Sequence, residues 1–181
     1  MIIKCIIQAR FSSKRLPGKV LRKIKNKEIL LHIVEKLKKN KNINKTIVAI
    51  STSKLDNKIK FFCKKKKLDY FRGNLQNVYR RYFDLLIKEK CDFFIRVCAD
   101  SPLLSEKILK RLIFFLKKYK NKYHLYTNVF PRSYPKGLSL EIINRKVFMD
   151  NIKNIKTQMF KEHITKYFYS NHKKFEIFNL K

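Results

Sequence analysis

Short apolar segments alternate with segments of helical periodicity along most of this 181-residue chain. The apolar segments have the length of strands, and between them apolar residues recur every three or four positions. This alternation is typical of βαβ units, which build a mainly parallel sheet covered by helices on both faces. We therefore predict an α/β fold, and the length predicts a single domain over residues 1–181. The predicted strands are 2–8, 45–52, 68–73 and 91–100, and the predicted helices run through 29–37, 59–63, 78–86 and 108–115.

Two polar residues mark where helices are expected to begin. Asn74 and Ser105 each precede a helical pattern, and their short side chains can accept a hydrogen bond from the first helical turn. After the fourth helix, "YHLYTN" predicts another strand. A loop rich in proline and glycine, "PRSYPKGL", then leads into "SLEIIN". No internal repeat or linker is visible, which agrees with one domain.

Polar residues follow the predicted strands at the points where each of them ends. The segment from Arg10 to Lys19 follows the first strand, Ser51 to Ser53 end the second, Arg72 and Gly73 end the third, and Asp100 ends the fourth. The carboxyl ends of parallel strands lie along one edge of a sheet, and ligands bind in the crevice outside that edge. The sequence therefore predicts a binding site at this edge.

The loop after the first strand carries three basic residues, Arg10, Arg15 and Lys19. The whole chain has three glycines, so it lacks the glycine-rich dinucleotide fingerprint, and "LPGK" lacks the first glycine of a P-loop. Guanidinium and ammonium groups would therefore hold an anion here, since arginine binds phosphate oxygens with two parallel hydrogen bonds. The alternative is an ordinary basic loop in a lysine-rich chain. Against it, arginine is the rarer basic residue, yet two occur within six positions.

Two acidic or metal-binding candidates stand out beyond the first loop. Asp100 is placed to hold Mg²⁺ against a phosphate, and the alternative is a carboxylate that caps the following loop. His163 follows Glu162, but "KEHIT" lacks the spacing of the HExxH zinc motif, and a single histidine is more often structural.

The chain carries 45 basic and 13 acidic residues, a net charge of +32. Such a charge favours nucleic acid as a partner. A second explanation is compositional bias, because AT-rich codons specify lysine, isoleucine, asparagine, phenylalanine and tyrosine. The lysines are scattered over predicted helix faces, as solvated residues would be.

Cysteine usage and hydropathy indicate the compartment. The four cysteines have no CxxC spacing, so we expect buried free thiols rather than zinc ligands or disulfides. No apolar stretch approaches the roughly 18 residues of a membrane span, and no secretory signal is recognisable at Met1. We therefore expect a cytoplasmic protein that does not contact a membrane.

Taken together, the motifs resemble the bacterial sugar cytidylyltransferases. "IIQARFSSKRLPGKVL" resembles the opening of the spore-coat-polysaccharide type, which is related to the acylneuraminate (CMP-sialic acid) and CMP-Kdo synthetases. The likeness covers almost the whole chain. It continues in order through "VAIST", "YFRGNLQNVYRRY", "IRVCADSPLL", "YPKGLSLEI" and "KEHITKYFY".

The resemblance implies a fold, a reaction and a set of site residues. The fold is the Rossmann-like, three-layer fold of the nucleotide-diphospho-sugar transferases. In the reaction, a hydroxyl of an acidic sugar attacks the α-phosphate of CTP, giving a CMP-sugar and pyrophosphate. Arg10, Ser12, Arg15 and Lys19 would hold the phosphates, Ser51, Arg72 and Gly73 would lie near the nucleoside, Asp100 would bind the catalytic Mg²⁺, and Gly137, Glu141, Glu162 and His163 would surround the sugar.

The sequence departs from the family pattern at a few places. Cys98 stands where threonine is common, Ser139 replaces a frequent aspartate, and Lys161 replaces a frequent arginine. The last two changes bear on which sugar is accepted. Family members also usually continue beyond "FEIFNLK" with a further carboxylate-bearing segment. We therefore expect a domain that lacks this segment, and we expect the lack to weaken catalysis more than it weakens nucleotide binding.

Two other functions remain as alternatives. The fold also hosts nucleotidyl- and glycosyltransferases that use other nucleotides. A basic protein that binds RNA or another polyanion would instead show a stripe of lysine and arginine with interleaved aromatic residues. The distinctive residues lie at strand ends, so we expect CTP and an acidic sugar as partners and no specific nucleic acid, and we leave a homodimer open.

Overall fold

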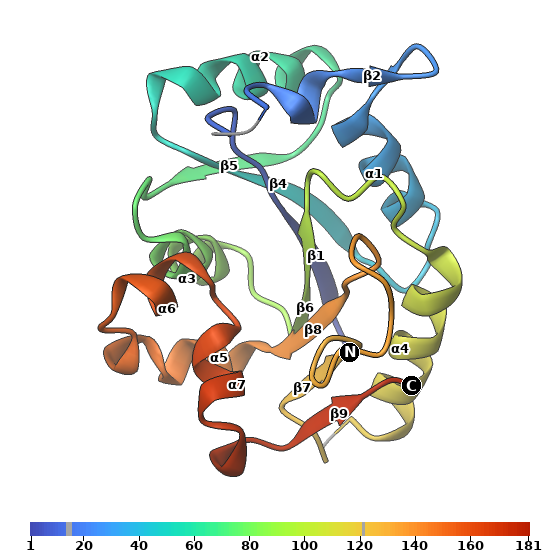
Figure 1. The fold of residues 1–181 in the computed structure, drawn as a ribbon, viewed down its shortest axis with the longest axis vertical. Coiled ribbons are helices and arrows are strands. Elements are labelled where there is room, and N and C mark those ends of the chain that lie inside the picture. The colour runs from blue at the N-terminus through green and yellow to red at the C-terminus, as the bar shows by residue number, and fades with distance from the viewer. Residues whose placement is uncertain (14–15, 121) are drawn as a thin grey trace.

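Seven strands form one sheet in the order β5–β4–β1–β6–β8–β7–β9 (Figure 1). The structure, a computed structural model, describes residues 1–13, 16–120 and 122–181. Strands β5, β4, β1 and β6 pair in parallel, and so do β7 and β9. Strand β8 pairs antiparallel with β6 on one side and with β7 on the other. Within this sheet β8 therefore runs against the other strands.

The elements alternate along the chain as the apolar pattern predicts. The strands of the main sheet are β1 (Ile3–Gln8), β4 (Lys45–Ser51), β5 (Tyr70–Gly73), β6 (Phe93–Cys98), β7 (Leu125–Thr127), β8 (Glu141–Asn144) and β9 (Ile177–Asn179). The helices are α1 (Ile29–Lys38), α2 (Asn57–Lys65), α3 (Val78–Lys88), α4 (Glu106–Lys118), α5 (Arg145–Asp150), α6 (Gln158–Glu162) and α7 (Lys166–Ser170). A hairpin of β2 (Lys23–Ile24) and β3 (Lys27–Glu28) and the 3-10 turns Lys19–Leu21, Lys54–Asp56, Ile152–Asn154 and His172–Lys174 complete the set.

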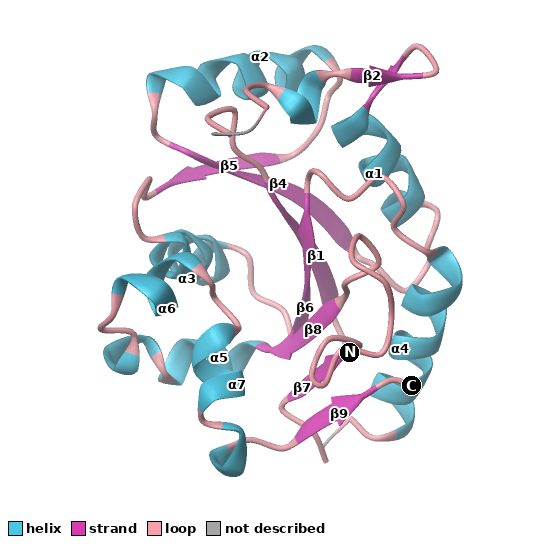
Figure 2. Cartoon of the chain, in the orientation of Figure 1, coloured by secondary structure: helices cyan, strands magenta, loops and turns pink. Residues whose placement is uncertain are grey.

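Helices cover both faces of the sheet and enclose two apolar cores. Figure 2 shows α1 and α4 on one side of the sheet and α3, α5 and α7 on the other. In β1, Ile3, Cys5 and Ile7 face the core under α1, α2 and α4, whereas Ile6 faces the core under α3, α5 and α7. Because β1 is buried on both faces, its sequence is a nearly continuous apolar run. The predicted α/β fold with a mainly parallel sheet is thus confirmed.

One of the two predicted helix starts is correct. Ser105 caps α4, since its hydroxyl accepts a hydrogen bond from the first helical turn. The prediction of Asn74 as the cap of α3 is wrong: Asn77 caps this helix by accepting from the Arg80 amide at 2.8 Å. The Asn74 side chain instead accepts from the Asn77 amide at 2.8 Å, so it stabilises the turn that precedes the helix.

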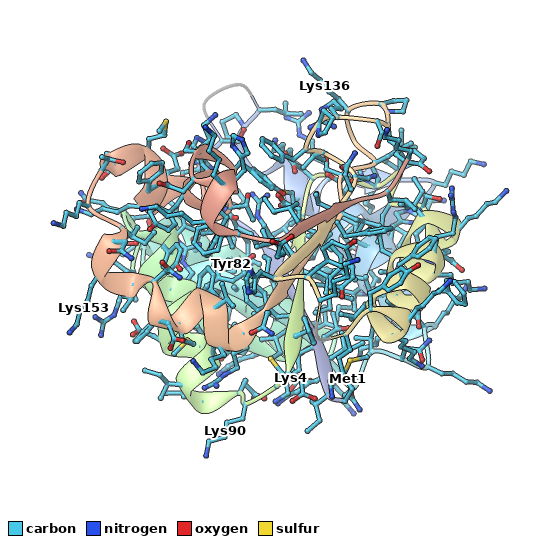
Figure 3. All side chains as sticks on the ribbon, turned by 90° about the horizontal axis from the view of Figure 1, so that it is seen from below. Met1, Lys4, Tyr82, Lys90, Lys136 and Lys153 are labelled. Atoms are coloured by element: carbon cyan, nitrogen blue, oxygen red, sulfur yellow. The ribbon has the colours of Figure 1, made fainter. Side chains whose placement is uncertain are left out.

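The many lysines lie on the outside of the molecule. Lys90, Lys136 and Lys153 extend from its periphery, whereas Tyr82 lies at its centre (Figure 3). No lysine is among the buried side chains of the described residues. This distribution agrees with solvated helix faces. All four cysteines are free thiols, and no helix among the described residues is both long and apolar enough to cross a membrane.

Aromatic rings fill the core between α3 and α5. Phe148 is fully buried and stacks on Tyr79, with ring centroids 3.9 Å apart. It also meets Phe94 of β6 edge to face at 5.0 Å. The Tyr79 hydroxyl donates to the Phe148 carbonyl at 2.6 Å, so this buried polar group is satisfied. Phe148 therefore fixes the position of α3 against the sheet.

We expect Phe148→Ala to lower the free energy of unfolding by about 3–5 kcal/mol, because it leaves a cavity in a closely packed core. Urea unfolding followed by circular dichroism measures the effect. Phe61→Ala in α2 is the matched control, since Phe61 is 64% exposed, and it should change stability by less than about 0.5 kcal/mol. Equal losses for the two variants would contradict this account of the core.

Candidate active site

A cavity of about 480 Å³ opens at the carboxyl ends of β1 and β6. Its other walls come from the loop after β1, from the start of α3 and from the end of α6. The charged residues that line it are Arg10, Lys19, Arg81, Arg96, Asp100 and Glu162. A larger cavity of about 660 Å³ lies at the amino end of β6. We place the site in the smaller one, because it lies at the sheet edge where parallel α/β folds bind ligands.

One buried carboxylate holds the loop after β1 in place. Asp56, 1% exposed, accepts a hydrogen bond from the Phe11 amide at 2.7 Å through Oδ1. Its Oδ2 accepts from the Ser51 amide at 2.9 Å and from the Ser51 hydroxyl. Asp56 therefore joins the loop after β1 to the end of β4. Nothing in the local sequence pattern around Asp56 indicated this role.

A tight turn closes the same loop. Gly18 has a φ of +70°, and its amide donates to the Phe11 carbonyl at 2.9 Å. A Cβ atom at this position would lie 2.8 Å from the Phe11 ring. The conformation and the close approach both require glycine. The glycine that follows Pro17 thus lets the loop fold back, which brings Lys19 to the cavity.

Two ion pairs cross the cavity between its walls. Lys19 at the end of the first loop pairs with Asp100, which lies just beyond β6. Arg10 pairs with Glu162 of α6 at 3.6 Å, and both of these side chains are largely exposed. In each pair a cation from the first loop faces a carboxylate from another segment. Exposed pairs of this kind contribute little to stability, so a stronger anionic ligand can replace the carboxylate.

A third ion pair forms the floor of the cavity. Arg96 of β6 lines the cavity and donates to Glu141 at 2.7 Å through Nη1. Glu141, which is buried, also accepts from the Tyr169 hydroxyl at 2.6 Å. Burial and the Glu141 carboxylate raise the pKa of Tyr169 well above its ordinary value, so this phenol stays protonated. Arg96 also approaches Gln8 Oε1 at 3.4 Å.

Arg81 forms the wall on the side of α3. Its side chain is buried, and its Nε and Nη2 donate to the Asn74 carbonyl at 3.0 and 2.8 Å. A further contact joins Nη2 to the Leu75 carbonyl at 3.3 Å. Sequence reasoning singled out neither Arg81 nor Arg96, because both lie inside regular elements rather than at a strand end.

The residues proposed from the sequence fall into three groups. One group lines the cavity, one lies elsewhere in the fold, and Arg15 lies outside the described residues. The lining group is Arg10, Ser12, Lys19, Asp100, Glu162 and His163. The group that does not line the cavity is Ser51, Arg72, Gly73, Gly137 and Glu141.

The residues of the second group have identifiable local contacts. Arg72 donates to the carbonyls of Ser51 and Ser53 at 3.1 and 3.0 Å, so it fixes the end of β4. Gly73 packs against Arg81, since a Cβ atom there would lie 2.7 Å from Arg81 Cγ. Gly137 adopts a φ of +94° in the loop before β8, with open space where a Cβ atom would lie.

The cavity offers few ligands for a metal ion. Among the described residues no group of three or more histidine, cysteine, aspartate or glutamate side chains is arranged to hold one. Asp100 lies at the cavity beside Lys19, and its carboxylate is partly exposed. A metal ion bound there would therefore take most of its ligands from a substrate and from water.

Comparison with known proteins gives a consistent result. The sequence model of the family described as "Cytidylyltransferase" matches residues 4–180. An uncharacterized protein of Methanocaldococcus jannaschii is 34% identical over 97% of this chain and 70% of its own length. The spore coat polysaccharide biosynthesis protein SpsF of Bacillus subtilis is 28% identical over 90% of this chain and 68% of its own length.

Solved structures agree with the sequence comparison. A cytidylyltransferase from Leptospira borgpetersenii superposes with a TM-score of 0.93 at 28% identity, covering 99% of this chain and 76% of that protein. A CMP:2-keto-3-deoxy-manno-octonic acid synthetase in complex with CTP shares the fold, with a TM-score of 0.73 at 14% identity over 99% of this chain and 89% of that one. The resemblance noted in the sequence is thus confirmed. A family match over nearly every residue, on a fold of the same kind, makes this chain a nucleotidyltransferase of the cytidylyltransferase family.

Proposed function

We propose that this protein transfers CMP from CTP to a hydroxyl of an acidic sugar and releases pyrophosphate, in the synthesis of a surface polysaccharide. The observation that carries the proposal is the convergence of Arg10, Lys19 and Asp100 on one cavity at the ends of β1 and β6. The similarity to a spore coat polysaccharide biosynthesis protein supports the role in polysaccharide synthesis. Since CTP is a cytoplasmic metabolite, the reaction would take place in the cytoplasm.

The triphosphate would bind where the two ion pairs now cross the cavity. Phosphate oxygens attract guanidinium and ammonium groups more strongly than a single exposed carboxylate does, because they carry more charge. Arg10 and Lys19 would therefore exchange Glu162 and Asp100 for phosphates. The Ser12 hydroxyl, on the same wall, would donate a further hydrogen bond. Arg15 is included in the proposal on the resemblance alone.

Asp100 would hold Mg²⁺ once Lys19 has turned to the phosphates. The carboxylate is an oxygen ligand of the kind Mg²⁺ prefers, and one carboxylate with substrate phosphates and water is a usual magnesium site. When bound, this ion supplies charge neutralisation at the reacting phosphates and at the leaving pyrophosphate. Asp100 would thus pair with Lys19 before the nucleotide binds and with Mg²⁺ afterwards, so its carboxylate has a cationic partner in both states.

The chemistry is an in-line displacement at phosphorus. A sugar hydroxyl attacks the α-phosphorus of CTP and releases its proton to water, a new P–O bond forms, and the bond to the oxygen that leads to the β-phosphate breaks. The protein contributes by positioning and by stabilising charge. Arg10 and Lys19 would stabilise the negative charge that develops on the departing pyrophosphate. Glu162 and His163 would contact the sugar from α6, because they line the same cavity.

Residues outside the cavity wall would act through those that line it. Glu141 would hold Arg96 toward the sugar, since its carboxylate is already bound by Arg96 and Tyr169. Ser51, Arg72 and Gly73 would shape the nucleoside side through the end of β4 and the start of α3. The Gly137 turn would approach the sugar from the loop before β8.

Selective stabilisation by CTP is the test of this proposal. We expect CTP with Mg²⁺ to raise the unfolding temperature more than UTP, ATP or GTP does at moderate salt, since a binding site discriminates between bases. Pyrophosphate release with Kdo and a panel of nonulosonic acids then identifies the acceptor. Equal shifts with all four nucleotides would indicate nonspecific attraction by the positive charge and would reject the proposal. Selectivity for another nucleotide would favour a different transferase of this fold.

We expect Asp100→Asn to abolish the effect of Mg²⁺ on CTP affinity. Without metal, CTP should bind to this variant as tightly as to the parent protein or more tightly, because Lys19 is then free of its carboxylate partner. Calorimetric titrations with Mg²⁺ and with EDTA measure both effects. Asp84→Asn is the control, since Asp84 pairs with Arg80 on the outside of α3. An unchanged Mg²⁺ effect in the Asp100 variant would remove this residue from the metal site.

We expect Asp56→Asn to weaken both the fold and CTP binding. An amide can accept at only one of its two polar atoms, so the amide of Phe11 or of Ser51 loses its partner. The loss in free energy of unfolding should be about 1–3 kcal/mol. Denaturant unfolding and a CTP titration measure the two effects. Asp69→Asn, at a largely exposed carboxylate, should leave both unchanged, and equal behaviour of the two variants would show that Asp56 does not fix the loop.

A further inference from the structure

Arg81 differs from the other positively charged side chains that line the cavity. Each of the others has a carboxylate within ion-pair distance, whereas Arg81 has none among the described residues. The pairs are Arg10–Glu162, Lys19–Asp100 and Arg96–Glu141. Arg81 is also the most buried of these cations, with 3% of the residue exposed. The cavity therefore contains one buried positive charge that has no carboxylate within ion-pair distance among the described residues.

The fold holds this guanidinium in a fixed position. Three contacts to the carbonyls of Asn74 and Leu75 use Nε and Nη2. A guanidinium has five N–H donors, and Nη1 has no hydrogen-bond partner among the described residues. Nη1 therefore keeps its N–H donors available for a ligand. Arg81 lines the cavity, so a ligand bound there can take up these donors.

Gly73 makes this position possible. A Cβ atom on Gly73 would lie 2.7 Å from Arg81 Cγ and 3.2 Å from Arg81 Cα. A side chain on the last residue of β5 would therefore push the first turn of α3 away from the sheet. The absence of a side chain at Gly73 lets Arg81 pass beside the strand and reach the cavity.

A buried charge without a counter-ion is energetically unfavourable. Burial lowers the pKa of Arg81 from its ordinary value, and the charge of Arg10 acts in the same direction, whereas Tyr82 and the more distant carboxylate of Asp56 act against it. Two cations on adjacent walls of one cavity repel each other until an anion lies between them. The arrangement thus favours an oxyanion at the point where the walls of α3 and of the first loop meet.

We propose that Arg81 binds a phosphate group of the nucleotide through Nη1, from the first turn of α3. The inference rests on the proposed function, since it assigns Arg81 to the same substrate. An acceptor carboxylate has the same oxyanion chemistry. The phosphate is favoured because Arg10 of the first loop lines the same cavity and lies close enough for its charge to act on Arg81.

Binding of inorganic triphosphate with Mg²⁺ tests the proposal, with Arg81→Gln compared against Arg80→Gln. The two residues are adjacent on α3 and the variants lose the same charge, but Arg80 is exposed and pairs with Asp84. We expect Arg81→Gln to reduce triphosphate affinity about tenfold or more, as loss of a charge-assisted hydrogen bond does. Arg80→Gln should leave it unchanged. A folded Arg81→Gln protein with parental triphosphate affinity would overturn the proposal.

Measuring the unfolding temperature with and without triphosphate separates a structural role of Arg81 from a role in phosphate binding. If Arg81 only holds the turn at Asn74, Arg81→Gln lowers the unfolding temperature but keeps the full increase caused by triphosphate, and the proposal is overturned. Arg81→Lys serves where the glutamine variant does not fold. Lysine keeps the positive charge, but it cannot both hold the turn at Asn74 and reach the ligand. The affinity for triphosphate should therefore fall again, and parental affinity would overturn the proposal.

Two further titrations identify the oxyanion and separate this proposal from the reaction. Loss of Kdo affinity with unchanged triphosphate affinity would assign Arg81 to the acceptor carboxylate and overturn the phosphate assignment. Triphosphate binding that depends on Arg81, in a protein without preference for CTP, would reject the proposed reaction and still support phosphate binding by Arg81.

Discussion

The buried carboxylate of Asp56 joins β1 and β4 at the edge where the cavity opens. Its two oxygens accept from the loop after β1 and from the end of β4, so that loop has little freedom to move away from the sheet. Arg10 precedes the anchored residue Phe11, and Lys19 follows the turn that closes on it. The positions of both cations therefore depend on one interaction that lies outside the cavity.

The charges inside the cavity are arranged differently from those on the surface. The net charge of +32 comes mainly from lysines, and those on the exposed surface contribute little to specificity. Inside the cavity, three of the four cations pair with a carboxylate, and Arg81 leaves an excess of positive charge. A polyphosphate with a divalent cation carries a net negative charge, so it can replace the carboxylates as partner of Arg10 and Lys19 and also balance Arg81.

Much of the cavity could be predicted because strand ends in a parallel sheet share one edge. Arg10, Lys19 and Asp100 follow from that rule alone. The rule says nothing about side chains that reach the cavity from inside an element, so Arg81 in α3 and Arg96 in β6 were missed. Asp56 was missed because the three groups that donate hydrogen bonds to it belong to two segments that only the fold brings together. The direction of β8 was likewise not predictable, since an apolar run carries no information about orientation.

Several residues of the recognisable motifs do not line the cavity. Their contacts show that they support the residues or the loop that form it. Ser51 donates to Asp56, which anchors the first loop. Gly73 leaves the space through which Arg81 passes. Glu141 holds Arg96, and Tyr169 completes the hydrogen bonds of that carboxylate. In the last two cases one residue touches the cavity and its neighbour fixes it there, and in the first the pair fixes the loop that carries Arg10 and Lys19. Since a site must hold its groups in place before the substrate arrives, a change in one of these neighbours should impair the site through the residue that it supports.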